Sequence, residues 1–341
     1  MRRHPPHHLS PARANTRQGR TQALLSRPSH HSNAPFKPEG QSILSKIVAL
    51  TPSKGSLRKS FSASNALSFV RAHKPEGHRF KSCPHAPRQS SSHSLLLWLQ
   101  GFADQAMRSV ECQVVNARAS DHPVSLSHAL VQAACPVALL VGDLTLAERY
   151  VKAIIDLSAR HAVELWNVGG RCFEGMLLIK RGNIGAGLEL LRTAFARVPQ
   201  NLLSLLYTAF LAEIADALGR DGKAAEGLSI IDEALARSER NEERWCVAEL
   251  LRVKGELILR EGAPQAATAA EEHFLRSLDW ARRQGALSWE LRTATSLARL
   301  QQDQGRAAEA RSLLQSVYDR FSEGFETADL KTAKAHLDSM Q

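Results

Sequence analysis

The apolar residues between Trp245 and Tyr318 recur at helical spacing, with charged and polar residues between them. This spacing places the apolar side chains on one stripe of an α-helix, because a helix has about 3.6 residues per turn. Small residues occur where the two helices of a hairpin would touch. The stretch therefore predicts consecutive helical hairpins, each of which buries one face.

The pattern repeats along the chain with a period of about 40 residues, and each unit has a turn glycine followed by a small residue at the predicted helix crossing. The turn glycines are Gly142, Gly182, Gly222, Gly262 and Gly305, and the small residues are Ala147, Gly187, Gly227, Ala270 and Ala310. An insertion, Ala263 to Gln265, accounts for the one longer unit. Such a period is typical of a helical solenoid of the tetratricopeptide kind. A plain helical bundle with fortuitous spacing is the alternative.

Further positions repeat in the same register. The second helix of each unit carries a large apolar residue and then a smaller one, and the first helix carries a small residue before its turn. The large residues are Val151, Leu191, Ile231, Phe274 and Leu314, and the smaller ones are Ile154, Ala194, Ala234, Ser277 and Val317. The small residues of the first helices are Cys135, Gly175, Ala215, Gly255 and Ala298. These positions predict the buried core of an all-α fold.

The predicted helices form five hairpins and part of a sixth. They cover 125–140 and 143–160, 163–180 and 184–198, 201–219 and 223–238, 242–260 and 266–284, and 288–303 and 307–321. A half unit precedes them, with its turn at Gly101 and its second helix over 103–118. Pro136 should bend the first full hairpin, and Thr327 should begin a helix that caps the open end of the stack. We therefore expect about five and a half repeats and a C-terminal capping helix.

The composition changes near residue 93. Residues 1–93 hold 16 of the 44 Lys and Arg residues but 2 of the 34 Asp and Glu residues, so the basic pI of about 9.7 arises there. The segment is rich in Pro, Ser, His and Arg, and it cannot bury enough apolar surface to offset an ordering cost of about 1–2 kcal/mol per residue. We expect 1–93 to be disordered and 94–341 to form the repeat domain.

Four interpretations of residues 1–93 stay open. Clustered Lys and Arg could neutralise the phosphates of a nucleic acid, and an Arg- and Ser-rich, acid-poor segment also suits a transit peptide. A plain linker is the third interpretation, and spurious translation of an upstream extension that replaces a larger N-terminal part is the fourth. The half repeat at the border favours the fourth, because functional tails usually join at unit boundaries.

Catalytic and cofactor motifs are not found in the sequence. The stretch Gly182 to Gly187 follows a predicted helix instead of a strand, and Gly219 to Ala224 lacks the hydroxyl of a phosphate-binding loop. The cluster around Glu239, Glu242 and Glu243 is interpreted as a solvated charged helix boundary. We expect no enzyme activity and no cofactor.

Cysteine usage and hydropathy bear on metal and location. The five cysteines are scattered without CxxC spacing, which favours buried reduced thiols over disulfides or zinc. The apolar run of the basic segment, Ile43 to Leu50, is far shorter than the roughly 20 residues of a membrane span. We expect no bound metal, no membrane contact and a cytoplasmic location.

The first helices of a right-handed stack line its concave face, and the residues there that do not pack could meet a ligand. By register these are Lys180, Arg220, Glu249, Arg252, Glu256, Arg292, Arg299 and Asp303. Their mixed signs favour a protein or peptide ligand over nucleic acid. Solvated charges with no ligand are the alternative.

Three stretches carry a family resemblance. They are RSERNEERWCVAELLRVKGELIL at 237–259, LDWARRQGALSWELRTATSLARLQQDQGRAAEARSLL at 278–314 and FSEGFETADLKTAKAHL at 321–337. From about Ser94 onward the chain resembles the C-terminal tetratricopeptide region of large bacterial signalling ATPases. Those proteins carry a winged-helix transcriptional-regulator domain or a class III adenylate/guanylate cyclase domain, then an ATPase domain and then such repeats.

The resemblance implies a sensor or protein-interaction tail of a regulatory protein. The chain contains neither the cyclase or DNA-binding part nor a Walker motif, so neither activity is carried over. The carboxylate clamp of other tetratricopeptide proteins is not matched, because the corresponding positions hold Arg252, Glu256, Thr295 and Arg299. The alternative is a regulatory protein whose basic segment contacts nucleic acid, and steep salt dependence of binding would identify it.

Overall fold

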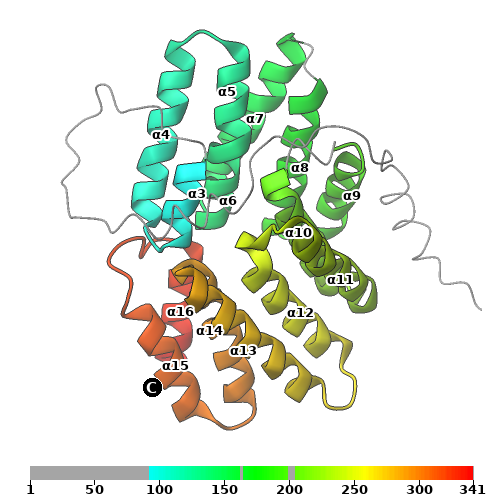
Figure 1. Ribbon diagram of the computed structural model, residues 1–341, viewed down its shortest axis with the longest axis vertical. Coiled ribbons are helices and arrows are strands. Elements are labelled where there is room, and N and C mark those ends of the chain that lie inside the picture. Colours follow the sequence, from blue (N-terminus) through cyan, green and yellow to red (C-terminus); the bar gives the residue numbers. More distant parts are fainter. Residues whose placement is uncertain (1–91, 162–163, 199–203, 341) are drawn as a thin grey trace, which may run out of the picture. The chain divides into compact units, whose positions relative to one another are not determined.

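The structure is a computed structural model that describes residues 92–161, 164–198 and 204–340. These residues belong to one compact unit, Gly40–Gln341. They are helical with short connections, and no β-strand occurs among them (Figure 1). The prediction of an all-α fold is therefore confirmed for the described part of the chain. The expectations for the basic segment 1–93 lie outside the described residues, apart from its last two positions.

The helices follow the predicted order. They are α3 (Ser92–Leu99), α4 (Ala103–Ala119), α5 (Pro123–Ala129), a π-helical segment (Leu130–Ala134), α6 (Cys135–Val141), α7 (Leu144–His161), α8 (Glu164–Lys180), α9 (Ile184–Phe195), α10 (Ser204–Arg220), α11 (Ala224–Asn241), a 3-10 turn (Arg244–Cys246), α12 (Val247–Glu261), α13 (Ala266–Gln284), α14 (Leu287–Asp303), α15 (Ala307–Tyr318) and α16 (Ala328–Ser339). The main differences from the predicted ranges are the earlier ends of α9 and α15 and the 3-10 turn before α12.

Consecutive helices pair into hairpins. Extensive contacts join α8 with α9, α10 with α11, α12 with α13 and α14 with α15, and contacts of similar extent join α7 with α8 (Figure 1). The predicted turn glycines lie between paired helices with φ values from 71° to 91°, as does Gly101. Residues with a Cβ atom are strained in this left-handed region. Glycine therefore allows the helix to end abruptly. The insertion Ala263 to Gln265 lies in the loop between α12 and α13.

The crossing of α8 and α9 depends on the absence of side chains. A Cβ atom on Gly175 would lie 2.7 Å from the backbone nitrogen of Leu191, and one on Gly187 would lie 2.7 Å from the carbonyl oxygen of Gly175. In the other hairpins Ala147, Ala270 and Ala310 are fully buried. The predicted small positions therefore lie where the helices approach most closely.

The second helices bury the predicted apolar stripe. Val151 is 3% exposed, and Leu191, Ile231, Phe274 and Leu314 are completely buried. Fully burying a Leu, Ile or Phe side chain is worth about 1.5–3 kcal/mol relative to exposure. This repeated stripe therefore accounts for much of the contact between the paired helices.

The proline in the first full hairpin is accommodated by a change of helix type. Pro136 is the second residue of α6, and the five residues before α6 form a π-helix in which the amide of Cys135 donates to the carbonyl of Leu130. A proline has no N–H and clashes with an α-helical turn, and a π-turn relieves both problems locally. The predicted disturbance at Pro136 thus takes the form of a wider turn inside one continuous helical run.

The same run is long and apolar. Pro123–Val141 has 19 residues, a mean hydropathy of 1.8 and few charges, which by length and composition would suffice to cross a membrane. Within the protein, however, 67% of it is buried. A buried core helix passes the same test, so the finding is weak evidence for a membrane span.

The first described hairpin touches the last elements of the chain. The indole rings of Trp98 and Trp289 lie 4.7 Å apart, edge to face. The backbone amide of Gln105 donates to Glu323 at 2.9 Å, and that of Gly324 donates to Asp104 at 3.2 Å. Residues about 220 positions apart in sequence are therefore in direct contact.

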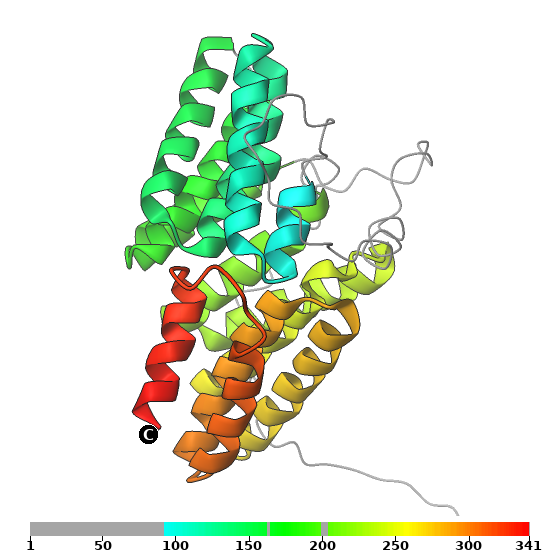
Figure 2. The ribbon, with the colours of Figure 1, turned by 90° about the vertical axis from the view of Figure 1, so that its left-hand side faces the viewer.

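The last helix, α16, packs on α14 and α15 (Figure 2). Its contact face consists of Leu330, Ala333 and Leu337, all of which are buried. These residues recur at intervals of three and four and therefore lie on one side of the helix.

Candidate functional site

The first helix of each of the five full hairpins contributes to one cavity of about 260 Å³, and α16 completes it. Its lining comes from α6, α8, α10, the 3-10 turn, α12, α14 and α16. On α14 the lining residues include Trp289, Arg292, Ser296 and Arg299, which follow one face of the helix at intervals of three to four residues. The cavity therefore lies where the register places the concave face.

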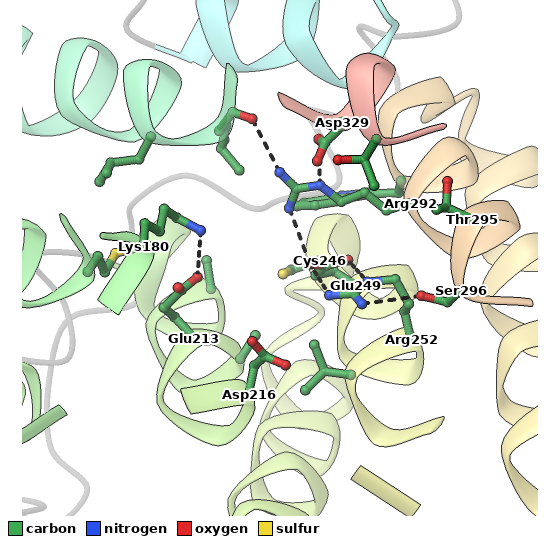
Figure 3. Close-up of a pocket in the computed structure, with 18 of the residues that line it drawn as sticks. Lys180, Glu213, Asp216, Cys246, Glu249, Arg252, Arg292, Thr295, Ser296 and Asp329 are labelled. Carbon is green, nitrogen blue, oxygen red and sulfur yellow. Dashed lines mark hydrogen bonds and ion pairs between the residues drawn. The ribbon is translucent and has the colours of Figure 1, made fainter. Parts of the chain in front are cut away.

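Arg292 joins several elements at this cavity. Its Nε donates to Asp329 of α16 at 2.7 Å, and one terminal nitrogen donates to Glu249 of α12 at 3.2 Å. The other terminal nitrogen donates to the carbonyl oxygen of Leu140 near the end of α6, also at 3.2 Å (Figure 3). The guanidinium also lies 5.2 Å and 5.0 Å from the ring centroids of Trp98 and Trp289, a cation–π distance.

Glu249 is held between two arginines. Arg252 donates to its two carboxylate oxygens at 2.7 Å and 2.9 Å, and Arg292 adds a third hydrogen bond. Burial by itself raises the pKa of the Glu249 carboxyl, but the charges and hydrogen bonds of the two arginines outweigh it and lower the pKa to about 2. The carboxylate is therefore ionised across the physiological range.

Glu256 of α12 connects the charged residues of α12 with those of α14. Ser296 donates to this carboxylate at 2.6 Å, while Arg252 and Arg299 lie 3.8 Å and 3.6 Å from it. The connected set Asp329, Arg292, Glu249, Arg252, Glu256 and Arg299 is called the charge ladder below. It links α12, α14 and α16 by alternating charges.

A second ion pair faces the charge ladder. Lys180 of α8 lies 3.2 Å from Glu213 of α10, and in the view of Figure 3 this pair stands on the other side of the cavity. Asp216, one turn further along α10, pairs with Arg260 at 2.9 Å. Arg220 ends α10, is exposed and lines the cavity, and among the described residues no ion pair joins it.

The structure places six of the eight predicted surface residues in the cavity lining. They are Lys180, Arg220, Glu249, Arg252, Arg292 and Arg299. Glu256 lies beside them in the charge ladder, and Asp303 is exposed at the end of α14, outside the lining. The expectation that these residues do not pack is wrong for Glu249 and Glu256, which are 7% and 8% exposed. Their charges are neutralised by Arg252 of the same helix and by Arg292 and Arg299 of α14.

Other lining residues escaped the prediction. Glu213 and Asp216 precede Arg220 by seven and four positions, so extending the register by two helical turns would have found them. Asp329 carried no such signal, because α16 lies outside the repeat and its partner Arg292 is 37 positions away. Cys246 and Trp289 were assigned no ligand-facing role, yet both line the cavity.

The boundary between α11 and α12 is less solvated than expected. Arg237 and Glu243 form an ion pair at 3.3 Å with side chains only 11% and 14% exposed. Arg237 also stacks on the ring of Tyr207, 4.0 Å from its centroid. The prediction of a solvated boundary agrees with Glu239 and Glu242, which are exposed, and is wrong for this pair.

Three of the described thiols are buried. Burial raises the pKa of Cys135 and Cys246 strongly and that of Cys172 to about 12, so these thiols stay protonated. In the described ranges no three His, Cys, Asp or Glu residues are grouped so that they could hold a metal ion. The arrangement is suited to noncovalent contact with a polar ligand.

Neither the protein-family models nor the curated protein sequences compared with this chain gave a match.

Proposed function

We propose that residues 92–340 form a non-catalytic, tetratricopeptide-like interaction module that holds a short peptide segment of a partner protein. The observation that carries this proposal is the cavity lined by the first helix of each of the five full hairpins and by α16. Its lining mixes hydrogen-bonding side chains with Leu139, Met176 and Trp289. Binding sites are commonly concave and combine apolar walls with a few placed polar groups.

The repeat architecture is part of the proposal. Turn glycines with left-handed φ, small residues at the crossings and a buried stripe recur at the predicted spacing. In a solenoid of this kind, α16 would act as the cap, since it covers α14 and α15 with an apolar face and turns polar residues outward.

The charges of the cavity favour binding over catalysis. A general base at neutral pH needs a pKa near the working pH, whereas two arginines lower the pKa of Glu249 to about 2. The cavity thiol, Cys246, is protonated because it is fully buried. Both groups are thus suited to holding structure and contacting a ligand.

The resemblance of the segment from about Ser94 onward supplies the wider context. A tail of this kind in a bacterial signalling ATPase would act as a sensor or docking part of a regulatory protein. We include that role in the proposal, with a cytoplasmic setting.

Blocking the cavity tests the function. Thr332 lines the cavity from the exposed side of α16, so Thr332→Trp would fill it at little cost to the core. Lys331→Trp adds the same ring at the neighbouring exposed position, which does not line the cavity. Displayed random peptides should be enriched on the wild-type chain, lose binding to Thr332→Trp and keep it on Lys331→Trp. Failure of enrichment, or equal binding to both variants, would contradict the proposal.

A further inference from the structure

The acidic and basic groups of the cavity largely neutralise one another. The charge ladder pairs each of its carboxylates with at least one arginine, and Lys180 pairs with Glu213 on the facing side. Arg260 neutralises Asp216 from just outside the lining. A peptide that offered both signs would have to break pairs that already exist, so the structure removes the advantage of a doubly charged ligand.

The lining keeps one surplus positive charge. Five basic residues line the cavity against four acidic ones. The two charged residues that join the network from outside the lining, Glu256 and Arg260, have opposite signs and cancel. A ligand with a single negative charge would therefore leave the cavity neutral.

The surplus charge can be located. Arg220 is exposed, and the described residues contribute no ion pair to it. The next most available cation is Arg299, whose side chain is 55% exposed and lies 3.6 Å from Glu256, beyond hydrogen-bond range. By contrast, the side chains of Arg252 and Arg292 are 16% and 17% exposed and fully engaged. Arg220 is thus the cation of the lining to which the described residues contribute no counter-charge.

The remainder of the lining suits an uncharged body. Leu139, Met176, Ala212, Val253 and Trp289 line the same space. At about 260 Å³ the cavity is slightly smaller than the roughly 300–1,000 Å³ typical of sites for drug-sized ligands. It would therefore admit the end of a peptide more easily than an extended stretch.

Resting on the proposed function, we infer that the cavity takes a peptide end with one carboxylate and an otherwise uncharged body, and that Arg220 binds the carboxylate. A planar guanidinium can donate two parallel hydrogen bonds to a carboxylate. This contact orients the carboxylate as well as neutralising its charge.

Two peptide pools that differ only in one charge provide the test. Both contain N-acetylated tetrapeptides of random uncharged residues; one pool ends in a free carboxylate and the other in an amide. Native mass spectrometry of the full chain should detect about two- to fivefold more of the carboxylate pool bound, which is the range expected for an ion pair with an exposed arginine. Arg220→Ala should reduce binding to the level of the amide pool, and Arg220→Lys should restore part of it.

The matched control is Arg149→Ala. Arg149 is an exposed arginine of α7 that does not line the cavity, so binding of the carboxylate pool should be unchanged. Circular dichroism of the variants would exclude unfolding as the cause of any loss. Arg220 ends a helix, where a cation also complements the helix dipole; lower stability with unchanged binding in Arg220→Ala would assign it that role and overturn the inference.

The outcomes separate the two proposals. Equal binding of both pools, or carboxylate binding that survives Arg220→Ala, overturns the single-carboxylate ligand and leaves the interaction module standing. The same holds if displayed peptides bind the cavity but neither tetrapeptide pool does. If no displayed peptide binds the cavity, the interaction module fails and this inference fails with it.

Discussion

The crossing of α8 with α9 and the charge ladder hold helices together in opposite ways. At the crossing, Gly175 and Gly187 bring two backbones into contact because neither has a side chain. In the charge ladder, Arg292 and Glu249 bridge helices with long side chains that are mostly buried. The first contact depends on shape alone, whereas the second depends on ionisation. The two regions should therefore respond differently to pH and to substitution.

The comparison also concerns distance along the chain. The glycines of the crossing lie within one hairpin, whereas Arg292 bonds to groups 37, 43 and 152 positions away. A local contact repeats with the period of the sequence. A contact between distant residues depends on how separate hairpins pack against each other. The repeat pattern within one hairpin does not specify that packing.

The largest effect is expected in the charge ladder. Glu249→Gln removes the charge between Arg252 and Arg292 and leaves two mostly buried guanidinium groups short of a counter-charge. Breaking a buried pair in this way typically costs about 3–5 kcal/mol of unfolding free energy. Urea denaturation at neutral pH would measure the loss.

Arg181→Ala is the control for that experiment. Arg181 forms an ion pair with Glu148 at 2.8 Å, but both side chains are far more exposed. Exposed pairs are screened by water and salt, so this variant should unfold at the same urea concentration as the wild type. Equal losses in the two variants would contradict the distinction between buried and exposed charges.

The second effect is a pH dependence. The pKa of Glu249 is about 2 in the folded protein against an ordinary value of 4.5. A lowered folded-state pKa stabilises the fold fully above pH 4.5, and the stabilisation is lost as the pH falls toward 2. The free energy of unfolding should therefore be about 3 kcal/mol lower once the Glu249 carboxylate is protonated.

Measuring unfolding between pH 6 and pH 2 would show this dependence. The gap in stability between wild type and Glu249→Gln should narrow as the solution is acidified. The penalty of a glycine substitution at the α8 and α9 crossing should stay constant over the same range. A gap that does not change with pH would show that the ionisation of Glu249 does not stabilise the fold.

A smaller effect is expected at the crossing itself. Gly187→Ala places a methyl group 2.7 Å from a backbone oxygen and 2.8 Å from the backbone nitrogen of Ile179, so the helices must separate. Overpacking of this kind costs about 1–3 kcal/mol. Thermal unfolding followed by circular dichroism would measure the lowered midpoint.

Gly185→Ala, two positions earlier in α9, is the matched control. No atom lies within 4 Å of a Cβ built there, and the residue is exposed. Alanine should stabilise the helix by about 0.5–1 kcal/mol, because it restricts the unfolded chain and favours helical backbone. Opposite signs at the two positions would support the crossing geometry, and equal signs would contradict it.

Much of the helical framework could be predicted from the sequence because it is local. The turn glycine Gly222 and the small residue Gly227 repeat because every hairpin must end one helix abruptly and bring the next one close. The π-helical segment before Pro136 was not predicted beyond a bend, since a proline can be relieved in several ways and the surrounding core selects one. The sequence identified the location of the irregularity but not its form.

The candidate site was only partly predictable. The register placed Lys180, Arg252 and Arg292 on the helix faces that line the cavity, because the spacing within one helix decides which of its residues share a face. The pairing of Arg292 with Asp329, and with the carbonyl of Leu140, requires the first and last elements to meet. The repeat pattern does not indicate that these elements pack together. For this reason charged residues that are buried and paired were predicted to be available to a ligand.

The contact between the first described hairpin and the end of the chain has a consequence for folding cooperativity. In an open repeat array the terminal units have one neighbour, so they fray first and exchange their amide hydrogens fastest. Here Gln105 and Asp104 of α4 bind the segment before α16, and Trp98 of α3 packs against Trp289 of α14. Asp329 of α16 in turn accepts a hydrogen bond from Arg292 of α14. The terminal helices should therefore open together with the middle ones, and amide protection in α4 and α16 should approach that of α10.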